Sequence, residues 1–134
     1  MSDYPYRAET DGVCVEVMPR FLPEQSDSDR ENYVWAYDVR ITNLGERTVQ
    51  LTERLWTITD GNGRSERVQG PGVVGEQPIL NPGDRFEYTS GCPLGTPSGI
   101  MRGSYTMVGE DGSSFEATIP AFSLDSPNGA RVLN

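Results

Sequence analysis

The sequence predicts an all-β protein, an antiparallel β-sandwich of about eight short strands. Several segments alternate apolar and polar residues, as strands do when they bury one face. The chain also contains 15 glycines and 10 prolines, spread among these segments, where turns are expected. No segment has a convincing helical period. Short alternating segments separated by turn residues are typical of a β-sandwich.

The first half of the chain supplies four of the expected strands, over residues 13–17, 33–41, 48–51 and 55–59. A polar loop, residues 19–32, joins the first two strands, and a turn over 43–46 follows the second. The clearest strand is 33–41, because its apolar residues fall at every second position. One face of this strand carries Tyr33, Trp35, Tyr37, Val39 and Ile41.

The second half supplies four more strands, over residues 64–68, 86–89, 101–107 and 115–119. Residues 60–63, Asp-Gly-Asn-Gly, predict a hairpin turn because Asn and Gly accept the positive φ that tight hairpins need. Residues 81–84, Asn-Pro-Gly-Asp, predict a second turn with proline at its favoured second position. We expect a single domain over residues 1–124 and a C-terminal tail over 125–134.

The charge of the chain restricts its partners. The net charge of −9 argues against nucleic acid and anionic membrane surfaces, because both are bound through cationic contacts. No apolar run reaches the roughly 18–20 residues of a membrane span. The segment from Met1 to Pro5 has neither the basic start nor the apolar core of a signal peptide. We therefore expect a cytoplasmic protein that is not a membrane protein.

Two residue types are absent, and their absence excludes most common enzyme classes. The chain has no histidine and no lysine. Ser-His-Asp and Cys-His nucleophile systems, Schiff-base chemistry and phosphate-binding lysines are therefore excluded. The two cysteines, Cys14 and Cys92, are not expected to form a disulfide in the cytoplasm. No catalytic residue is predicted, and the chain is not expected to be an enzyme.

Residues 70–75, Gly-Pro-Gly-Val-Val-Gly, match the dinucleotide fingerprint G-x-G-x-x-G, but no helix follows them. Pro78, Pro82 and Gly83 cannot propagate the helix whose N-terminus would face a pyrophosphate. One interpretation is a nest of backbone amides that binds phosphate or pyrophosphate. Its residues would be Gly70, Gly72, Val73, Val74, Gly75 and Glu76, with help from Arg64 or Arg67. The other interpretation is a structural loop between the sheets, whose glycines supply positive φ.

Metal binding rests on carboxylates alone. Asp27, Asp29 and Glu31 alternate, so an extended loop would present oxygens to a hard cation such as Mg²⁺. The simpler interpretation is a solvated acidic loop, and no metal ligand is assigned. Cobalt fits poorly, because it favours nitrogen or sulfur ligands.

The segment from Cys92 to Gly103 is a second candidate site. It is interpreted either as a surface that binds a protein partner or as a rigid crossover between sheets. The residues of the candidate surface are Cys92, Pro93, Leu94, Pro97, Met101 and Arg102.

Several motifs together resemble one family. They are residues 33–37 (YVWAY), 43–46 (NLGE), 70–78 (GPGVVGEQP), 80–83 (LNPG), 88–94 (YTSGCPL), 96–99 (TPSG), 101–105 (MRGSY) and 119–124 (IPAFSL). In this order, from about Val13 to Leu124, they resemble the ApaG family. The resemblance implies a fibronectin type III-like (immunoglobulin-like) β-sandwich. It also implies an association with cobalt resistance and magnesium efflux, and a role as an interaction module. Family members often have histidine where this chain has Leu55, which weakens a metal role there.

Taken together, these observations indicate a non-catalytic, cytoplasmic binding domain. Its expected ligand is a protein partner or a small phosphate-like anion at the Gly70–Gly75 loop. The alternative is a phosphate-ester or pyrophosphate hydrolase that uses Glu76, Asp84 and bound Mg²⁺, because two-metal hydrolysis can run on carboxylates. No cofactor is firmly implied, and Mg²⁺ is the one candidate.

Overall fold

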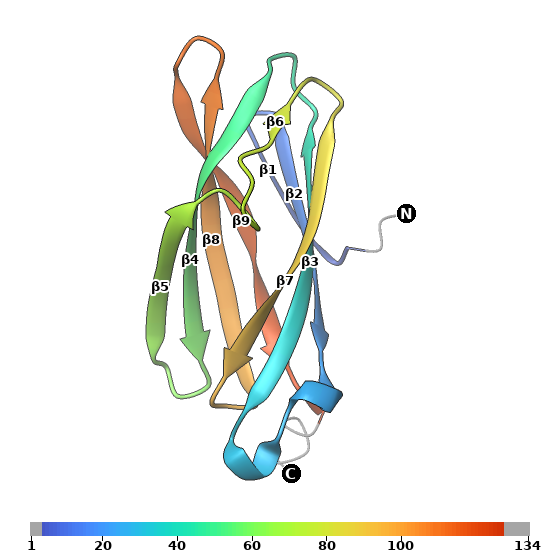
Figure 1. Ribbon diagram of the computed structural model, residues 1–134, viewed down its shortest axis with the longest axis vertical. Helices are drawn as coiled ribbons and strands as arrows, with labels where there is room; N and C mark the ends of the chain where they lie inside the picture. Colours follow the sequence, from blue (N-terminus) through green and yellow to red (C-terminus); the bar gives the residue numbers. More distant parts are fainter. Residues whose placement is uncertain (1–3, 128–134) are drawn as a thin grey trace.

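The computed structural model describes residues 4–127 and confirms the all-β sandwich (Figure 1). Two antiparallel sheets pack face to face. Two 3₁₀ turns, η1 (Pro23–Gln25) and η2 (Ser28–Arg30), lie between the second and third strands. Within the described residues, no helix is long and apolar enough to cross a membrane. The strands are β1 (Tyr6–Thr10), β2 (Val13–Phe21), β3 (Tyr33–Asn43), β4 (Val49–Asp60), β5 (Ser65–Pro71), β6 (Ile79–Leu80), β7 (Arg85–Leu94), β8 (Ser98–Gly109) and β9 (Ser114–Asp125).

The strand order is that of an immunoglobulin-like sandwich. One sheet has the order β1-β2-β3-β7, and the other has the order β5-β4-β8-β9 with β6 added beside β4. Strands β2-β3-β7 and β4-β8-β9 correspond to the A-B-E and C-F-G sets of that fold, and β5 adds to the second sheet as a C′ strand does.

The core lies between the sheets and is built by the alternation read from the sequence. On β3, Trp35, Val39 and Ile41 are almost completely buried, and Tyr37 is buried beside them. The facing sheet contributes Trp56 from β4 together with Tyr105 and Met107 from β8. Period-2 alternation therefore predicted the buried face correctly, since successive side chains in a strand point to opposite sides.

The structure differs from the prediction in the division of the strands. Residues 49–51 and 55–59 belong to one strand, β4, because a register shift between Leu51 and Glu53 keeps both parts paired with β8. A β-bulge of this kind interrupts the period without ending the strand. β1 and β6 were not predicted, because β1 lacks an apolar run and β6 has two residues.

The last strand ends close to the expected domain boundary at residue 124. β9 continues to Asp125, and Ser126 is buried. The part of the expected tail from 128 to 134 lies outside the described residues.

Gly103 sets the distance between the two central strands of the second sheet. It pairs with Trp56, next to the register shift in the β8–β9 ladder between Met101 and Gly103. A Cβ at Gly103 would overlap the carbonyl oxygen of Leu55. Glycine is therefore required where β8 approaches the part of β4 that carries the site described below.

Candidate functional site

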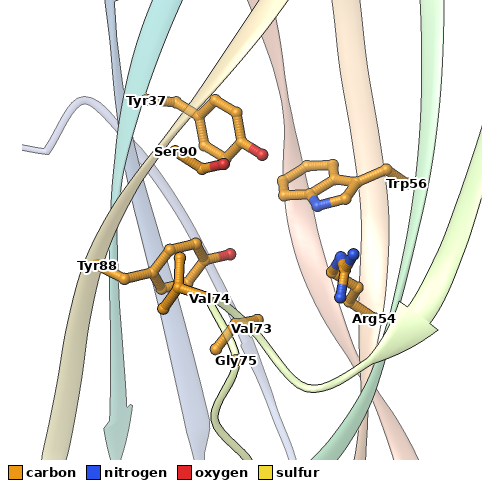
Figure 2. A pocket seen from close by; sticks show the side chains of 8 residues that line it. All are labelled: Tyr37, Arg54, Trp56, Val73, Val74, Gly75, Tyr88 and Ser90. Carbon is orange, nitrogen blue, oxygen red and sulfur yellow. The ribbon is translucent and has the colours of Figure 1, made fainter.

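A cavity of about 220 Å³ opens between the two sheets on the side where β5 and β7 are edge strands. Figure 2 shows the residues that line it: Tyr37, Arg54, Trp56, Val73, Val74, Gly75, Tyr88 and Ser90. A second cavity of about 310 Å³ shares Tyr37, Arg54, Trp56 and Ser90 with the first. The two cavities therefore form one groove, which we call the inter-sheet groove.

The groove exists because the sandwich is closed on one side only. On the opposite side β1 lies against β9, where the hydroxyl groups of Tyr6 and Ser123 hydrogen-bond at 3.2 Å. Contacts between β5 and β7 are few. The loop after β5 covers part of the opening, because Val73 inserts into the core and is only 1% exposed.

Arg54 points from β4 into this opening and contacts the loop (Figure 2). Its Nη1 atom donates to the carbonyl oxygens of Pro71 at 3.0 Å and Gly72 at 2.9 Å. No carboxylate among residues 4–127 forms an ion pair with Arg54. Arg54 is partly buried, so its uncompensated charge is screened less than that of a surface arginine.

Trp56 adds a buried donor to the same cavity. The residue is 3% exposed, and its indole N–H donates to no acceptor within residues 4–127. Every fully enclosed polar side-chain atom in that range has a hydrogen-bond partner, so this N–H opens into the space that Trp56 lines. Figure 2 shows the indole nitrogen on the side of the ring that faces Arg54. An unused donor in so buried a residue is uncommon and calls for a ligand or water.

The hydroxyl groups of the cavity are neutral donors at physiological pH. Burial raises the pKa of Tyr37, and the neighbouring Ser90 and the charge of Arg54 each lower it in part. Burial also raises the pKa of Tyr88 far above its ordinary value, and its hydroxyl bonds to that of the fully buried Tyr105 at 2.5 Å. Each hydroxyl keeps capacity for a further hydrogen bond. The lining is therefore rich in donors and carries one positive charge.

The glycine motif forms a tight hairpin at the mouth of the cavity. Val73 and Glu76 exchange two backbone hydrogen bonds, of 2.8 and 2.9 Å. Both residues between them have positive φ, +44° at Val74 and +81° at Gly75. Positive φ at both central positions defines a type I′ turn, which normally takes Asn-Gly. A β-branched residue in this conformation is strained, and Val74 is also 54% exposed at the tip.

The loop offers fewer free amides than an anion nest over residues 70–76 would need. The amide of Gly72 donates to Thr52, and those of Val73 and Glu76 donate to each other's carbonyl groups. The amides of Val74 and Gly75 have no acceptor in the part of the chain that the structure describes. The carbonyl groups of Pro71 and Gly72 face Arg54, and the positive charge in the cavity comes from that side chain.

The arginines considered from the sequence lie elsewhere. Arg64 is in the turn before β5 and is exposed. Arg67 is exposed on β5 opposite Thr57, one residue before the half-buried Val68 that lines the groove, so its side chain points to the outer face of the sheet.

The acidic residues considered for metal binding are dispersed. Glu76 is exposed on the hairpin, and the Asp84 carboxylate accepts from the Asn81 amide at 2.9 Å. Asp27 accepts from the amide of Asp29 and caps η2. Within residues 4–127, no group of three or more Asp, Glu or Cys side chains is arranged to hold a metal ion.

The six residues of the candidate partner surface do not share one face. Cys92 and Met101 are buried and, with Pro93, line the second cavity of the groove. Arg102 is exposed and pairs with Thr57 on the outer face. Leu94 and Pro97 are half-buried near the end of β7 and in the following loop.

Both cysteines have free thiols, in agreement with the expectation that they form no disulfide. Burial raises the pKa of the Cys92 thiol to about 11, and the negative charge of Glu66 adds to this effect. The Cys92 thiol is therefore uncharged at physiological pH and lines the groove as a neutral group.

Sequence reasoning missed the residues that line the centre of the cavity: Tyr37, Arg54, Trp56, Tyr88 and Ser90. Tyr37 and Trp56 read as ordinary core residues. Arg54 was missed because it lies between the two predicted strands, 48–51 and 55–59; in β4 it precedes Trp56 by two residues and shares its inward face. An arginine at an inward position of a strand is the signal that marks the site once the register is known.

Comparisons with known proteins agree with the fold and the motifs. Residues 23–109 match the family described as the ApaG domain (DUF525). The curated relative Protein ApaG from Methylocella silvestris is 61% identical over 129 residues, covering 96% of this chain and 99% of that protein. Protein ApaG from Bradyrhizobium diazoefficiens is 60% identical with the same coverage. The crystal structure of the "Putative ApaA Protein" from Bordetella pertussis has a TM-score of 0.84 at 53% identity, covering 92% of this chain and 98% of that one.

Proposed function

This chain belongs to the ApaG domain family, and we propose that it is a non-catalytic binding domain for a small phosphate- or pyrophosphate-like anion. The anion lies in the inter-sheet groove under the Gly70–Gly75 loop. The observation that carries the proposal is the pairing of an uncompensated Arg54 with the unused N–H of the buried Trp56.

An anion satisfies both groups at once. An arginine binds oxyanions through several N–H groups, and such charge-assisted hydrogen bonds are stronger than neutral ones. The indole N–H and the hydroxyl groups of Tyr37, Tyr88 and Ser90 supply further donors around the same space. The two free amides of Val74 and Gly75 lie at the mouth, so the loop contributes to the site through its tip.

The proposal assigns no chemistry to the bound anion. Glu76 and Asp84, the carboxylates of the hydrolase alternative, do not line the cavity. Tyr37, Tyr88 and Cys92 are held neutral by burial and offer no base near pH 7. Binding without turnover is the simplest function for this set of groups.

The wider role follows the resemblance. We place the protein in the cytoplasm, where anion binding would affect cobalt and magnesium homeostasis through a protein partner. The net charge of −9 opposes binding to nucleic acid.

The test is a titration with phosphate and with pyrophosphate, with and without Mg²⁺, followed by heteronuclear NMR and by phosphate release. We expect shifts at residues 54, 56 and 72–76 without turnover. Arg54→Met keeps the apolar stem and removes the charge, so binding should weaken at least about tenfold. Arg67→Met is the matched control on the outer face and should bind as the parent does. Turnover that Glu76→Ala abolishes would overturn the proposal.

A further inference from the structure

The second cavity of the inter-sheet groove differs from the first in its lining. Besides the four shared residues, its walls include the apolar side chains of Ile58, Val68, Pro93 and Met101 together with the neutral thiol of Cys92. Its volume, about 310 Å³, exceeds the 220 Å³ of the polar cavity next to it. A phosphate or pyrophosphate ion would leave this space unused.

The two cavities form one binding surface with a polar end and an apolar end. Tyr37, Arg54, Trp56 and Ser90 line both of them, so nothing separates a group bound at Arg54 from the apolar walls. The indole of Trp56 presents its N–H to the polar end, while the ring packs with the core. Aromatic residues with one polar atom are suited to such a boundary.

Charge fixes the direction in which a ligand lies. Arg54 is at the polar end, and Glu66 lines the second cavity from β5. Arg54 pairs with Gly70 and Ile58 pairs with Glu66, so four residues of strand, about 13 Å, separate the two charges along the sheet. A negatively charged group is therefore attracted to one end of the groove and repelled from the other.

We infer that the ligand of the groove is an organic anion, a carboxylate or a phosphate monoester with an apolar body. Its charged group binds between Arg54 and Trp56, and its apolar body lies against Val68 and Met101. This inference rests on the proposed function for the anion site and adds the chemical class of the ligand.

The experiment titrates the full chain with acetate, hexanoate, hexyl phosphate and the neutral 1-hexanol, with inorganic pyrophosphate in parallel, by NMR and calorimetry. Each buried methylene strengthens binding about fourfold. Hexanoate, which has four more methylenes than acetate, should bind at least about 30-fold more tightly than acetate, with shifts at Val68 and Met101. The comparison of hexanoate with hexyl phosphate shows which anionic group the site prefers.

Variants locate the apolar body. Val68→Thr keeps the shape of the side chain and introduces a hydroxyl on the cavity wall, so hexanoate should bind about three- to tenfold more weakly while pyrophosphate binding is unchanged. Val108→Thr, the same substitution on β8 outside the groove, should have no effect. Because both positions are half-buried, neither variant should prevent folding.

Three outcomes would overturn the inference. Pyrophosphate binding without any gain from acetate to hexanoate would overturn it and leave the proposed function standing. Equal binding of 1-hexanol and hexanoate would show that the charge has no role. No binding of any probe would overturn the inference and the proposed function together.

Discussion

The three glycines of the G-x-G-x-x-G motif should differ sharply in what they contribute to stability. At Gly72, φ is +60°, and a Cβ would overlap the carbonyl oxygen of Glu76 across the hairpin. At Gly75, φ is +81°, but nothing lies within 4 Å of a Cβ. At Gly70, φ is not positive, and a Cβ would meet the guanidinium of Arg54 at 3.2–3.3 Å.

These contacts set the order and the size of the effects. Gly72→Ala adds a backbone clash, about 1–3 kcal/mol, to the 1–2 kcal/mol of a positive φ, so the free energy of unfolding should fall by about 3 kcal/mol. Gly75→Ala adds only the cost of the positive φ, so the free energy of unfolding should fall by about 1 kcal/mol. Gly70→Ala should cost less than about 1 kcal/mol, because a flexible side chain can move. It should nevertheless weaken anion binding, since Arg54 moves.

Urea unfolding of the three variants, followed by tryptophan fluorescence, measures the differences. A common slope of the free energy against urea concentration would show that the same surface is exposed in each case. Gly72→Ala within about 0.5 kcal/mol of the parent would refute the reasoning, and so would equal losses in all three variants. Equal losses would mean that the positions do not differ in space and φ as the structure shows.

Three further predictions concern the hairpin, the sheet and pH. Val74→Asn should raise the free energy of unfolding by about 1 kcal/mol in the same urea assay, because Asn-Gly suits a type I′ turn; no gain would contradict the assigned turn. Gly103→Ala should lower the free energy of unfolding by about 2–3 kcal/mol, because its Cβ would overlap the Leu55 carbonyl oxygen. Gly91→Ala, whose Cβ would have an ordinary contact, should lower it by less than about 1 kcal/mol. The hydrogen bond from Arg20 lowers the pKa of Asp38, so this carboxylate stabilises the fold above its ordinary pKa of about 3.9, and the contribution is lost as pH falls through the lower folded value. The parent should therefore lose more stability than Asp38→Asn between pH 5 and pH 2, and equal losses would show that the pair does not contribute.

The β-sandwich could be predicted from the sequence because the patterns that indicate it are local. The alternation on β3 and the turn residues around 60–63 and 81–84 each depend on neighbours in the chain, and the structure confirms all of them. The register shift after Leu51 could not be predicted in the same way, since it is fixed by pairing with β8 about fifty residues later. Extended past this shift, the alternation of Val49 and Leu51 would place Arg54 on the outer face, whereas the bulge turns it inward with Trp56.

The site was predictable only in part for the same reason. The loop at 70–76 was correctly identified as an unusual backbone, because glycine and proline mark it directly. Its partners in the cavity come from β3, β4 and β7, which the loop meets only when the two sheets are packed. The missing helix excluded a dinucleotide fold, but no local pattern shows which way the loop amides and carbonyls face.

The glycine motif therefore has the opposite electrostatic role from the same motif in a dinucleotide-binding fold. In a dinucleotide-binding fold the glycines let backbone amides and a helix N-terminus, worth about half a positive charge, approach the anion directly. Here the loop turns its Pro71 and Gly72 carbonyl groups toward Arg54, and two of its amides close the hairpin on itself. The carbonyls hold the guanidinium in place, and the guanidinium presents a full positive charge to the cavity. The same glycine spacing thus positions a cation under a β-hairpin, and in the proposed anion site Arg54 and Trp56 are the binding groups, with the loop as their support.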